Sequence, residues 1–295
     1  MFIIEEYIDK LIINLPPPPT IPTQIDLVMD GGAFNGSYLI GCLFFLKRME
    51  KLKYIVIHRI SGCSISSFLG LLYLIDSLNN VESTNYYENA YTHFIKHKNL
   101  NLLFSIDTFL PETIDVSLLS KRLYITYHNI HDMKRVVINK FKNKQHLCEC
   151  IIRSSFVPYL INGELLHKNK YIDGLMPFLF QAKKNRKILY LKLINYEKIY
   201  DMINVTNENT NYGRILSGLL DIHIFYIKKS STNICSYVNE WNILCKLTYF
   251  IKMCFVKCIV YVIFFIKTFH DFFPNKLYLR LSKIITQELL YALLS

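Results

Sequence analysis

The chain has 295 residues, of which 52% are hydrophobic and 19% are charged, and its formal net charge is +11. This length suits one large α/β domain, or at most two domains, and the high apolar content excludes a disordered chain. Residues 181–295 hold 16 Lys and Arg against 7 Asp and Glu, so most of the positive charge lies there. Because this segment is also rich in aromatic and aliphatic residues, it favours an anionic lipid surface over nucleic acid. We find no nucleic-acid-binding motif.

The N-terminal residues 1–20 are predicted to form a helix and a stiff connector. Apolar residues at positions 3, 4, 7, 8, 11, 12 and 15 make a helical stripe, and the four prolines at 16–19 must be extended. The first 15 residues carry acidic side chains where a signal peptide has a basic region, and they contain no small-residue cleavage site. We therefore expect an intracellular, cytoplasmic protein whose eight cysteines are reduced and mostly buried.

Two pairs of metal-ligand residues occur in the chain, Cys148 with Cys150 and His93 with His97. Neither pair has the further ligands at the spacing that a zinc site requires. We expect no metal and no organic cofactor.

Residues 21–200 alternate between strand and helix patterns. Strands are predicted near 25–29, 54–60 and 187–196, and helices over 35–52 and 64–78. This alternation predicts a mainly parallel sheet covered by helices, with ligands beyond the carboxyl ends of the strands. Residues 80–150 mix both signals, and we expect them to elaborate the region over the site.

The remaining residues, 201–295, are predicted to form a basic, aromatic and mainly helical extension. The apolar run at 258–266 is too short to cross a membrane, which takes about 20 residues. Extending it back to Tyr249 includes Lys252 and Lys257. Residues 248–268 are therefore interpreted as an interfacial helix or a buried core helix, and a single transmembrane span around 249–266 is the alternative.

The segment Gly62-Cys63-Ser64-Ile65-Ser66 lies where a predicted strand meets a predicted helix. A nucleophilic serine on such a turn needs small residues two positions away on each side, because strand and helix approach closely there. Gly62 and Ser66 meet this need. The short pattern occurs often by chance, so taken in isolation it favours Ser64 as a small residue that begins a helix.

A second turn strengthens the catalytic interpretation of Ser64. The stretch DGGAFNG at 30–36 is another glycine-rich strand-to-helix turn, and its amides are candidates for an oxyanion hole, namely those of Gly31, Gly32, Ala33 and Gly36. Nucleotide binding is the alternative, but the P-loop pattern is absent and Ala33 interrupts the dinucleotide-binding pattern.

Three blocks in this order resemble the patatin-like phospholipase family. They are LVMDGGAFNGSYLIGCLFFLKRME, ISGCSISSFLGLLYLI and the stretch 151–178, in which Asp173 and Gly174 follow a small-residue segment and a proline. The resemblance covers roughly residues 25–180. It implies a three-layer α/β/α sandwich and a catalytic dyad of Ser64 and Asp173, with the oxyanion held by the loop at 31–36.

The sequence departs from the family pattern at four positions. Ala33 stands where a third glycine is usual, and Asn35 replaces a Lys or Arg. Ser66 replaces the second glycine of the serine turn, and Leu175 follows Gly174 where Gly or Ala is usual. We expect Ala33 to have a negative φ, because alanine rarely adopts a positive one.

The resemblance implies hydrolysis of the acyl esters of phospholipids or other lipids, by a protein that is peripheral on membranes. Two alternatives remain open. One is a catalytically silent lipid-binding or membrane-scaffolding protein, which the weakened glycine pattern permits. The other is an acyltransferase that uses the same dyad with a different acceptor.

Overall fold

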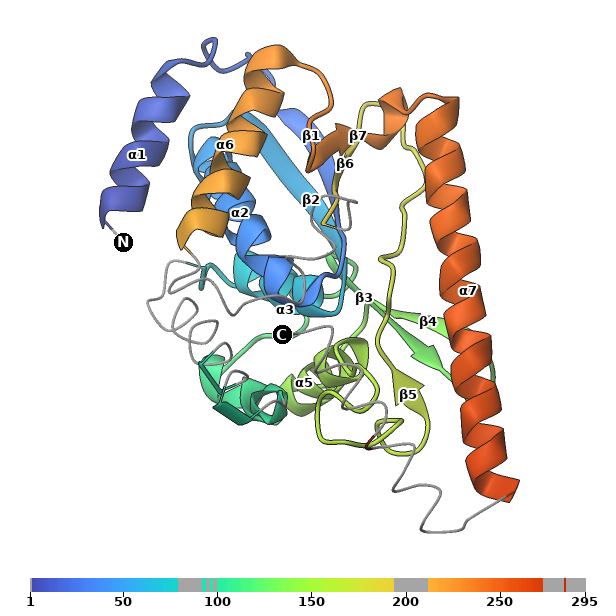
Figure 1. Ribbon diagram of the computed structural model, residues 1–295. Helices are drawn as coiled ribbons and strands as arrows, with labels where there is room; N and C mark the ends of the chain where they lie inside the picture. The colour runs from blue at the N-terminus through green and yellow to red at the C-terminus, as the bar shows by residue number, and fades with distance from the viewer. Residues whose placement is uncertain are drawn as a thin grey trace.

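A mixed seven-stranded sheet lies at the centre of the molecule, seen nearly edge-on in Figure 1. The computed structural model describes residues 2–78, 100–193 and 212–272, together with 92, 93, 96, 97 and 284. The strand order is β4-β3-β2-β1-β6-β7, with the short β5 paired to β3. The strands β3, β2, β1 and β6 are parallel, and β4, β5 and β7 run antiparallel to their neighbours. The bounds are β1 Thr23–Met29, β2 Ile55–Cys63, β3 Leu123–Asn129, β4 Lys134–Ile138, β5 Tyr171–Ile172, β6 Lys187–Leu191 and β7 Cys235–Tyr237.

Strand β1 shows how the sheet acquires two buried faces. Its side chains alternate, so Ile25, Leu27 and Met29 join the main core. Val28, between them, joins a separate cluster on the opposite face of the sheet with Tyr190 of β6. Both faces therefore need a covering layer.

The first layer consists of helices packed against the main core. They are α1 Phe2–Ile13, α2 Gly36–Lys51, α3 Ile65–Leu74, α5 Lys144–Ser154 and α6 Tyr212–Lys228, with short 3-10 turns at Ala33–Asn35 and Asn101–Phe109. A third 3-10 turn, Val238–Glu240, begins with Val238, which packs on the opposite face of the sheet. Helices α2 and α6 cross closely at two glycines. A Cβ on Gly41 would lie 1.9 Å from the carbonyl oxygen of Ile215, and one on Gly218 would lie 1.9 Å from that of Tyr38. Helix α6 thus forms part of the sheet's main helical layer (Figure 1).

Helix α7, Ile243–Phe272, stands on the other side of the sheet (Figure 1). Near its start Tyr249 packs on the cluster that holds Val28 and Tyr190. Further along, Val260 and Ile263 pack against Ile172 of β5 and its neighbours. The molecule is therefore an α/β protein with a mostly parallel, mixed open sheet and helices on both sides, which is compatible with a three-layer α/β/α architecture.

The structure bears directly on several expectations from the sequence. The N-terminal helix, the helices expected over 35–52 and 64–78, and the strands near 25–29 and 54–60 are confirmed as elements. The strand expected over 187–196 is confirmed for Lys187–Leu191, and residues 194–196 lie outside the described residues. Five of the eight cysteines are buried thiols, and Cys245, Cys254 and Cys258 are exposed.

Other expectations need correction. The sheet does not stop at residue 200, because β7 pairs with β6 from within the expected extension. Residues 80–150 are more than an elaboration, since β3 and β4 extend the central sheet. A buried core helix over 248–268 is wrong: α7 is longer than that, and only 17% of its most apolar window is buried. Among the described residues it is the one helix long and apolar enough to cross a membrane, a property compatible with a peripheral or a single-span membrane protein.

Candidate active site

Ser64 lies on a strained turn between β2 and α3. Its φ of 54° and ψ of −138° are unusual for a residue with a side chain. The turn is tight enough to require glycine at position 62, where a Cβ would lie 2.6 Å from the carbonyl oxygen of Ser66. Ser64 itself is only partly buried. The backbone thus has the form of a nucleophile elbow, with the serine at its tip.

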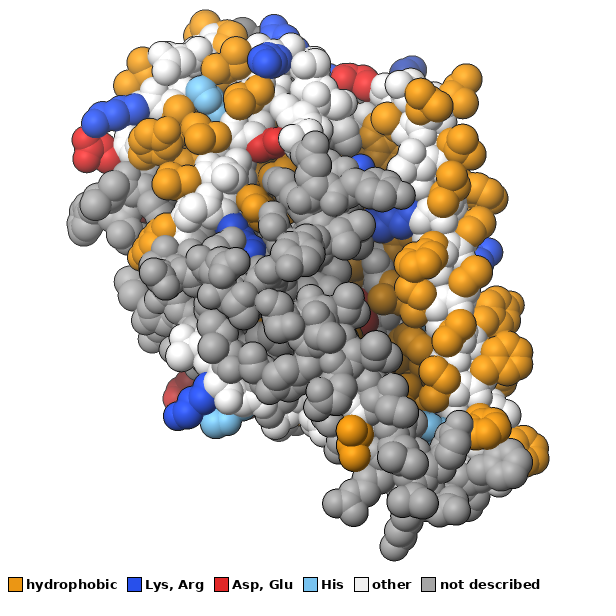
Figure 2. All heavy atoms as spheres, in the orientation of Figure 1, with side chains coloured by type: hydrophobic (Ala, Val, Ile, Leu, Met, Phe, Trp, Pro, Cys, Tyr) orange, Lys and Arg blue, Asp and Glu red, His pale blue; other side chains and the backbone are white. Residues whose placement is uncertain are grey.

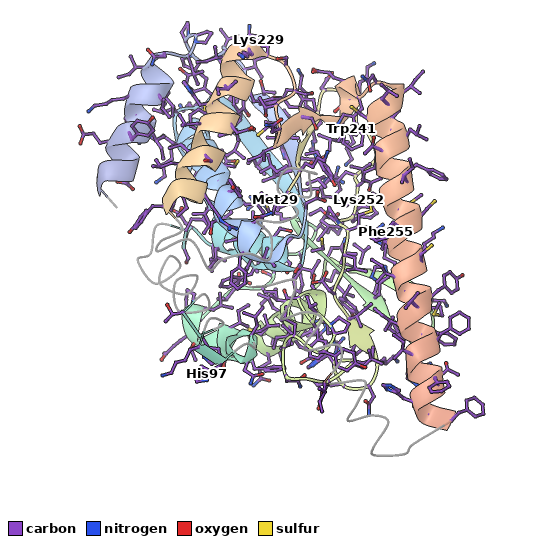
Figure 3. The ribbon with its side chains drawn as sticks, in the orientation of Figure 1. Met29, His97, Lys229, Trp241, Lys252 and Phe255 are labelled. Atoms are coloured by element: carbon purple, nitrogen blue, oxygen red, sulfur yellow. The ribbon has the colours of Figure 1, made fainter. Side chains whose placement is uncertain are left out.

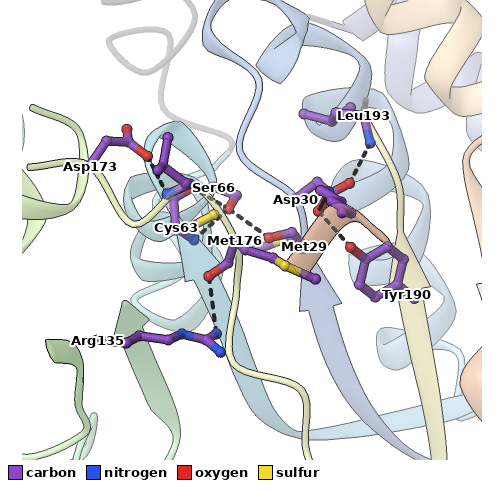
Figure 4. Close-up of polar contacts among 11 residues, drawn as sticks. Met29, Asp30, Cys63, Ser66, Arg135, Asp173, Met176, Tyr190 and Leu193 are labelled. Atoms are coloured by element: carbon purple, nitrogen blue, oxygen red, sulfur yellow. Dashed lines mark hydrogen bonds and ion pairs between the residues drawn. The ribbon is translucent and has the colours of Figure 1, made fainter. Parts of the chain in front are cut away.

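Ser66 has a structural role at its position in this turn. Its hydroxyl accepts from the amide of Cys63 at 2.9 Å and lies within hydrogen-bond distance of the carbonyl oxygens of Cys63, at 2.7 Å, and Met29, at 2.9 Å. Figure 4 shows Ser66 between Cys63 and Met29. A side chain at this position therefore ties the elbow to the end of β1, which a glycine would not do.

Asp173 follows β5 and is brought to the elbow by Ser154, the last residue of α5. The carbonyl oxygen of Ser154 accepts from the amides of both Ser64, at 2.9 Å, and Gly174, at 3.1 Å. The Ser154 hydroxyl also lies 3.0 Å from the Ser64 amide and donates to the carbonyl oxygen of Thr126 at 2.6 Å. The role of Ser154 was not predicted from the sequence, in which its place in the small-residue segment of the third block is the one indication.

Because Gly174 has no side chain, the aspartate turn can approach the serine turn closely. A Cβ at position 174 would lie 2.1 Å from the carbonyl oxygen of Thr126 and 2.7 Å from the Cβ of Cys63. The next residue, Leu175, has a φ of 54°. The turn thus accepts leucine in the left-handed region, and the Leu175 amide donates to Oδ1 of Asp173 at 2.6 Å.

The carboxyl group of Asp173 is buried, with 3% of the residue exposed. Burial raises the pKa of Asp173 to about 6, against the opposing effect of the hydroxyl of Ser64 and the amide of Leu175. Within the described part of the chain, Oδ2 accepts no hydrogen bond of ordinary geometry. A carboxyl group that titrates near 6 next to a serine hydroxyl is suited to accept its proton at neutral pH.

His128 lies beside the aspartate turn but does not contact the Asp173 carboxylate. Nδ1 of His128 lies 3.1 Å from the backbone carbonyl oxygen of Asp173, not its carboxylate. Burial lowers the pKa of His128, so its ring is neutral and donates from Nδ1. His128 therefore supports the backbone of the aspartate turn.

The glycine-rich turn lies beside the elbow, as expected from the order of the strands. A Cβ on Gly31 would be 3.0 Å from the Cβ of Ser64, so this backbone runs directly against the serine. Gly32 has an extended φ of 169° and packs against Leu193. The amide of Gly36 is already used, since it donates to the carbonyl oxygens of Ala33 and Phe34. Of the four candidate oxyanion donors, the Gly36 amide is thus engaged within its own turn, and the Gly31 amide contacts the Cys63 thiol.

The φ of Ala33 is 43°, contrary to the negative value expected from the sequence. The reason is that the chain turns sharply here. A few residues after the end of β1 it enters the 3-10 turn Ala33–Asn35, and α2 begins directly after that turn. A small residue tolerates this left-handed position at a cost of roughly 1 kcal/mol. The turn keeps the shape that a glycine would give it.

Asn35 receives a positive charge from another part of the chain. Nη1 of Arg214, on α6, donates to Oδ1 of Asn35 at 3.0 Å, and both side chains are buried. Arg214 thus places a positive charge beside position 35, where the residue itself is uncharged, although 179 residues separate the two partners. This contact was missed because nothing local in the sequence connects α6 with the first turn.

Asp30 carries a second charge cluster at the carboxyl end of β1. Its Oδ1 accepts from the hydroxyl of Tyr190 at 2.6 Å and from Nζ of Lys252, on α7, at 2.7 Å. Figure 4 shows Asp30 between Tyr190 and Leu193, and Figure 3 shows Lys252 on the side of α7 that faces the domain. Burial raises the pKa of the Cys63 thiol well above its usual range; the charges of Asp173 and Asp30 raise it further and that of Lys252 lowers it. The charges of Asp173, Asp30 and Lys252 therefore all act on Cys63, the residue next to Ser64 in the elbow.

A groove of about 250 Å³ separates α7 from the strands next to the aspartate turn. Its lining includes Met133, Met176, Met253 and Val256, with His128 and Arg135. Met176 lies three residues after Asp173, and its carbonyl oxygen accepts from Nη2 of Arg135 at 3.1 Å. The groove is therefore partly apolar, has a cation in its lining and lies beside the aspartate turn.

Comparison with known proteins adds no identification. No family model matches the sequence, and no curated protein matches it. The candidate site rests on its own geometry: a serine on a strained elbow, a buried carboxyl group facing it, and a glycine-rich turn packed against the serine.

Proposed function

We propose that the protein is a serine hydrolase of acyl lipids, in which Ser64 and Asp173 form a catalytic dyad of the patatin-like kind. The observation that carries this proposal is the buried Asp173 carboxyl, with a pKa of about 6, facing Ser64 at the tip of its elbow. A purely structural aspartate before a glycine has no need of burial or of a strained serine beside it.

In the proposed reaction, Oγ of Ser64 attacks the acyl carbon as the carboxylate of Asp173 takes its proton. The negative charge on the carbonyl oxygen is stabilised by amides of the turn at 31–33, each well-placed donor contributing roughly 3 kcal/mol. The bond to the alcohol then breaks, and the proton on Asp173 passes to the departing oxygen. Water attacks the acyl-serine and gives a proton to Asp173, which passes it to Oγ of Ser64 as the bond between Oγ and the acyl carbon breaks and the fatty acid leaves.

A lipid substrate is supported by the groove beside the aspartate turn. Its methionine side chains are adaptable and apolar, which suits an alkyl chain, and Arg135 provides one cation for an anionic head group. We propose that the substrate is a phospholipid or another acyl lipid and that the enzyme works as a peripheral protein at a membrane surface, on the cytoplasmic side.

The experiment is to treat the folded protein with a fluorophosphonate and to map the adduct by mass spectrometry. We expect labelling at Ser64, none in Ser64→Ala, and a large loss in Asp173→Asn. The matched control is Asp132→Asn, because Asp132 is exposed and, among the residues that the structure describes, binds Asn129 and His131. Absence of labelling in folded protein would reject the dyad and favour the silent lipid-binding scaffold.

An acyltransferase would pass the labelling test as well, because it forms the same acyl-serine. Product analysis separates the two reactions. Release of free fatty acid from a labelled phospholipid supports hydrolysis, whereas transfer of the label to an added lysolipid or alcohol, without release, supports the acyltransferase.

A further inference from the structure

The outward side of α7 is apolar along the length of the helix. Leu247, Phe250, Ile251, Phe255, Tyr261 and Phe265 are each between 50% and 67% exposed. At 3.6 residues per turn these six side chains fall within an arc of about 140°. The lysines of the helix, at 246, 252, 257 and 267, lie outside that arc. Figure 2 shows the hydrophobic side chains running along α7. We call this arc the outer face of α7.

The inward side of α7 is packed on the domain. Val256, Val260 and Ile263 are buried, and Tyr249 stacks near Trp241 with ring centroids 5.4 Å apart. Between them, Lys252 makes its ion pair with Asp30, whose side chain is fully buried. Contacts with the domain therefore extend over several turns of the helix.

These contacts conflict with a transmembrane position for α7. A helix that crosses a bilayer exposes its length to lipid or to other spanning segments, whereas α7 lies against a polar α/β domain. Withdrawing it would leave the Asp30 carboxylate buried without its cation, which is costly. The packing favours a helix that stays on the domain.

We propose that α7 is an in-plane membrane-docking helix, whose outer face enters the headgroup boundary of an anionic phospholipid bilayer while Lys252 holds its inner face to Asp30. Charge complementarity supports this partner. The helix carries four lysines and one acidic residue, Asp271, which is paired with Lys267 at 2.6 Å. Lys246 and Lys257 are exposed beside the apolar arc, the arrangement typical of interfacial helices.

This docking would hold the domain on the bilayer in a defined orientation. It deepens the proposed function by naming the surface on which the enzyme works, but it does not depend on catalysis. Binding is therefore measured in Ser64→Ala protein, so that a failure of hydrolysis and a failure of docking are told apart.

The first test is co-sedimentation with vesicles of phosphatidylcholine, alone or mixed with phosphatidylserine. We expect binding to the mixed vesicles and, for Phe265→Glu, an affinity at least about tenfold lower. The matched control is Leu118→Glu, because Leu118 is 66% exposed, as Phe265 is 67% exposed, but lies outside α7. Equal losses in both variants, or no binding by the parent protein, would overturn the proposal.

The second test uses the exposed cysteines to determine the orientation of the helix. Three variants each keep one exposed cysteine. The first keeps Cys245, the second keeps Cys254, and the third carries Asp271→Cys with the three natural exposed cysteines changed to serine. Each variant is treated with a membrane-impermeant maleimide added outside sealed vesicles. In-plane docking predicts that vesicles protect Cys254, on the outer face, while both helix ends react. Protection of one end would show a span, and protection of Cys254 in a dimer without vesicles would show a second copy as the partner.

Discussion

At the scale of single residues, Asp173 decides the chemistry. Its carboxyl is buried and titrates near 6, so at neutral pH most molecules hold it as a carboxylate able to take the Ser64 proton. We predict that kcat/KM for a soluble short-chain ester falls about tenfold for each pH unit below that pKa. A pH profile from stopped or continuous assays checks this, and an acid limb near the ordinary aspartate pKa would contradict it.

The burial of Asp173 also predicts that ionisation of its carboxyl group lowers the stability of the fold. The pKa of Asp173 is higher in the folded state than its ordinary value of 3.8, so the fold binds the proton more tightly. The resulting stabilisation is present below about pH 4 and is lost as the pH rises through 6, amounting to roughly 2 to 3 kcal/mol. We therefore expect Asp173→Asn to unfold at a higher temperature than the parent at about pH 8, with little difference at about pH 4. Equal melting temperatures at both pH values would show that the carboxyl is solvated.

Arg214 supplies the cation at the first turn. Arg214→Met leaves Oδ1 of Asn35 without this donor, and we expect a loss of about 1 to 3 kcal/mol in stability together with a lower turnover rate. Arg214→Lys should restore part of both. The control is Arg48→Met, because the pair of Arg48 and Asp9 is 40% and 45% exposed and contributes little. Similar effects of the two methionine variants would remove any special role for Arg214.

At the scale of elements, the site depends on turns that follow strands and precede helices. Gly174→Ala places a methyl group 2.1 Å from the carbonyl oxygen of Thr126, so the aspartate turn must move away from the elbow. We expect fluorophosphonate labelling of Ser64 to be lost in this variant. Gly213→Ala is the control, because nothing lies within 4 Å of the added Cβ near the start of α6. Undiminished labelling of the Gly174 variant would show that the two turns act independently.

The elements of the site could be predicted because their signals are local. A run of β-branched residues followed by glycine and a helical stripe identifies each turn without any knowledge of the rest of the chain. The conformations within the turns could not be predicted so well. Ala33 adopts a positive φ because neighbouring strands and helices hold both ends of the turn, and that constraint outweighs the preference of alanine.

At the scale of the whole molecule, Lys252 and Asp30 join α7 to the sheet. We predict that Lys252→Met destabilises the protein by about 3 to 5 kcal/mol, because it leaves the buried Asp30 carboxylate unpaired. The double variant Lys252→Met with Asp30→Asn should recover most of that loss, since the charge is removed with its partner. Chemical denaturation of the two single variants and the double variant measures the coupling. Additive losses would show that the pair is not a structural link.

The amino-acid sequence by itself determined the alternation of strands and helices, the two glycine-rich turns, and Ser64 and Asp173 as candidates, because these depend on neighbours within a few residues. Only the tertiary structure decided which groups surround them. Ser154 holds Ser64 from 90 positions away, Arg214 reaches Asn35 across 179, and Lys252 reaches Asp30 across 222. Such pairings follow from the way the sheet and its covering helices pack, and no local pattern encodes them. The same holds for α7, whose apolar sequence permits a core helix, a span or a surface helix until its packing on the sheet leaves the outer face exposed.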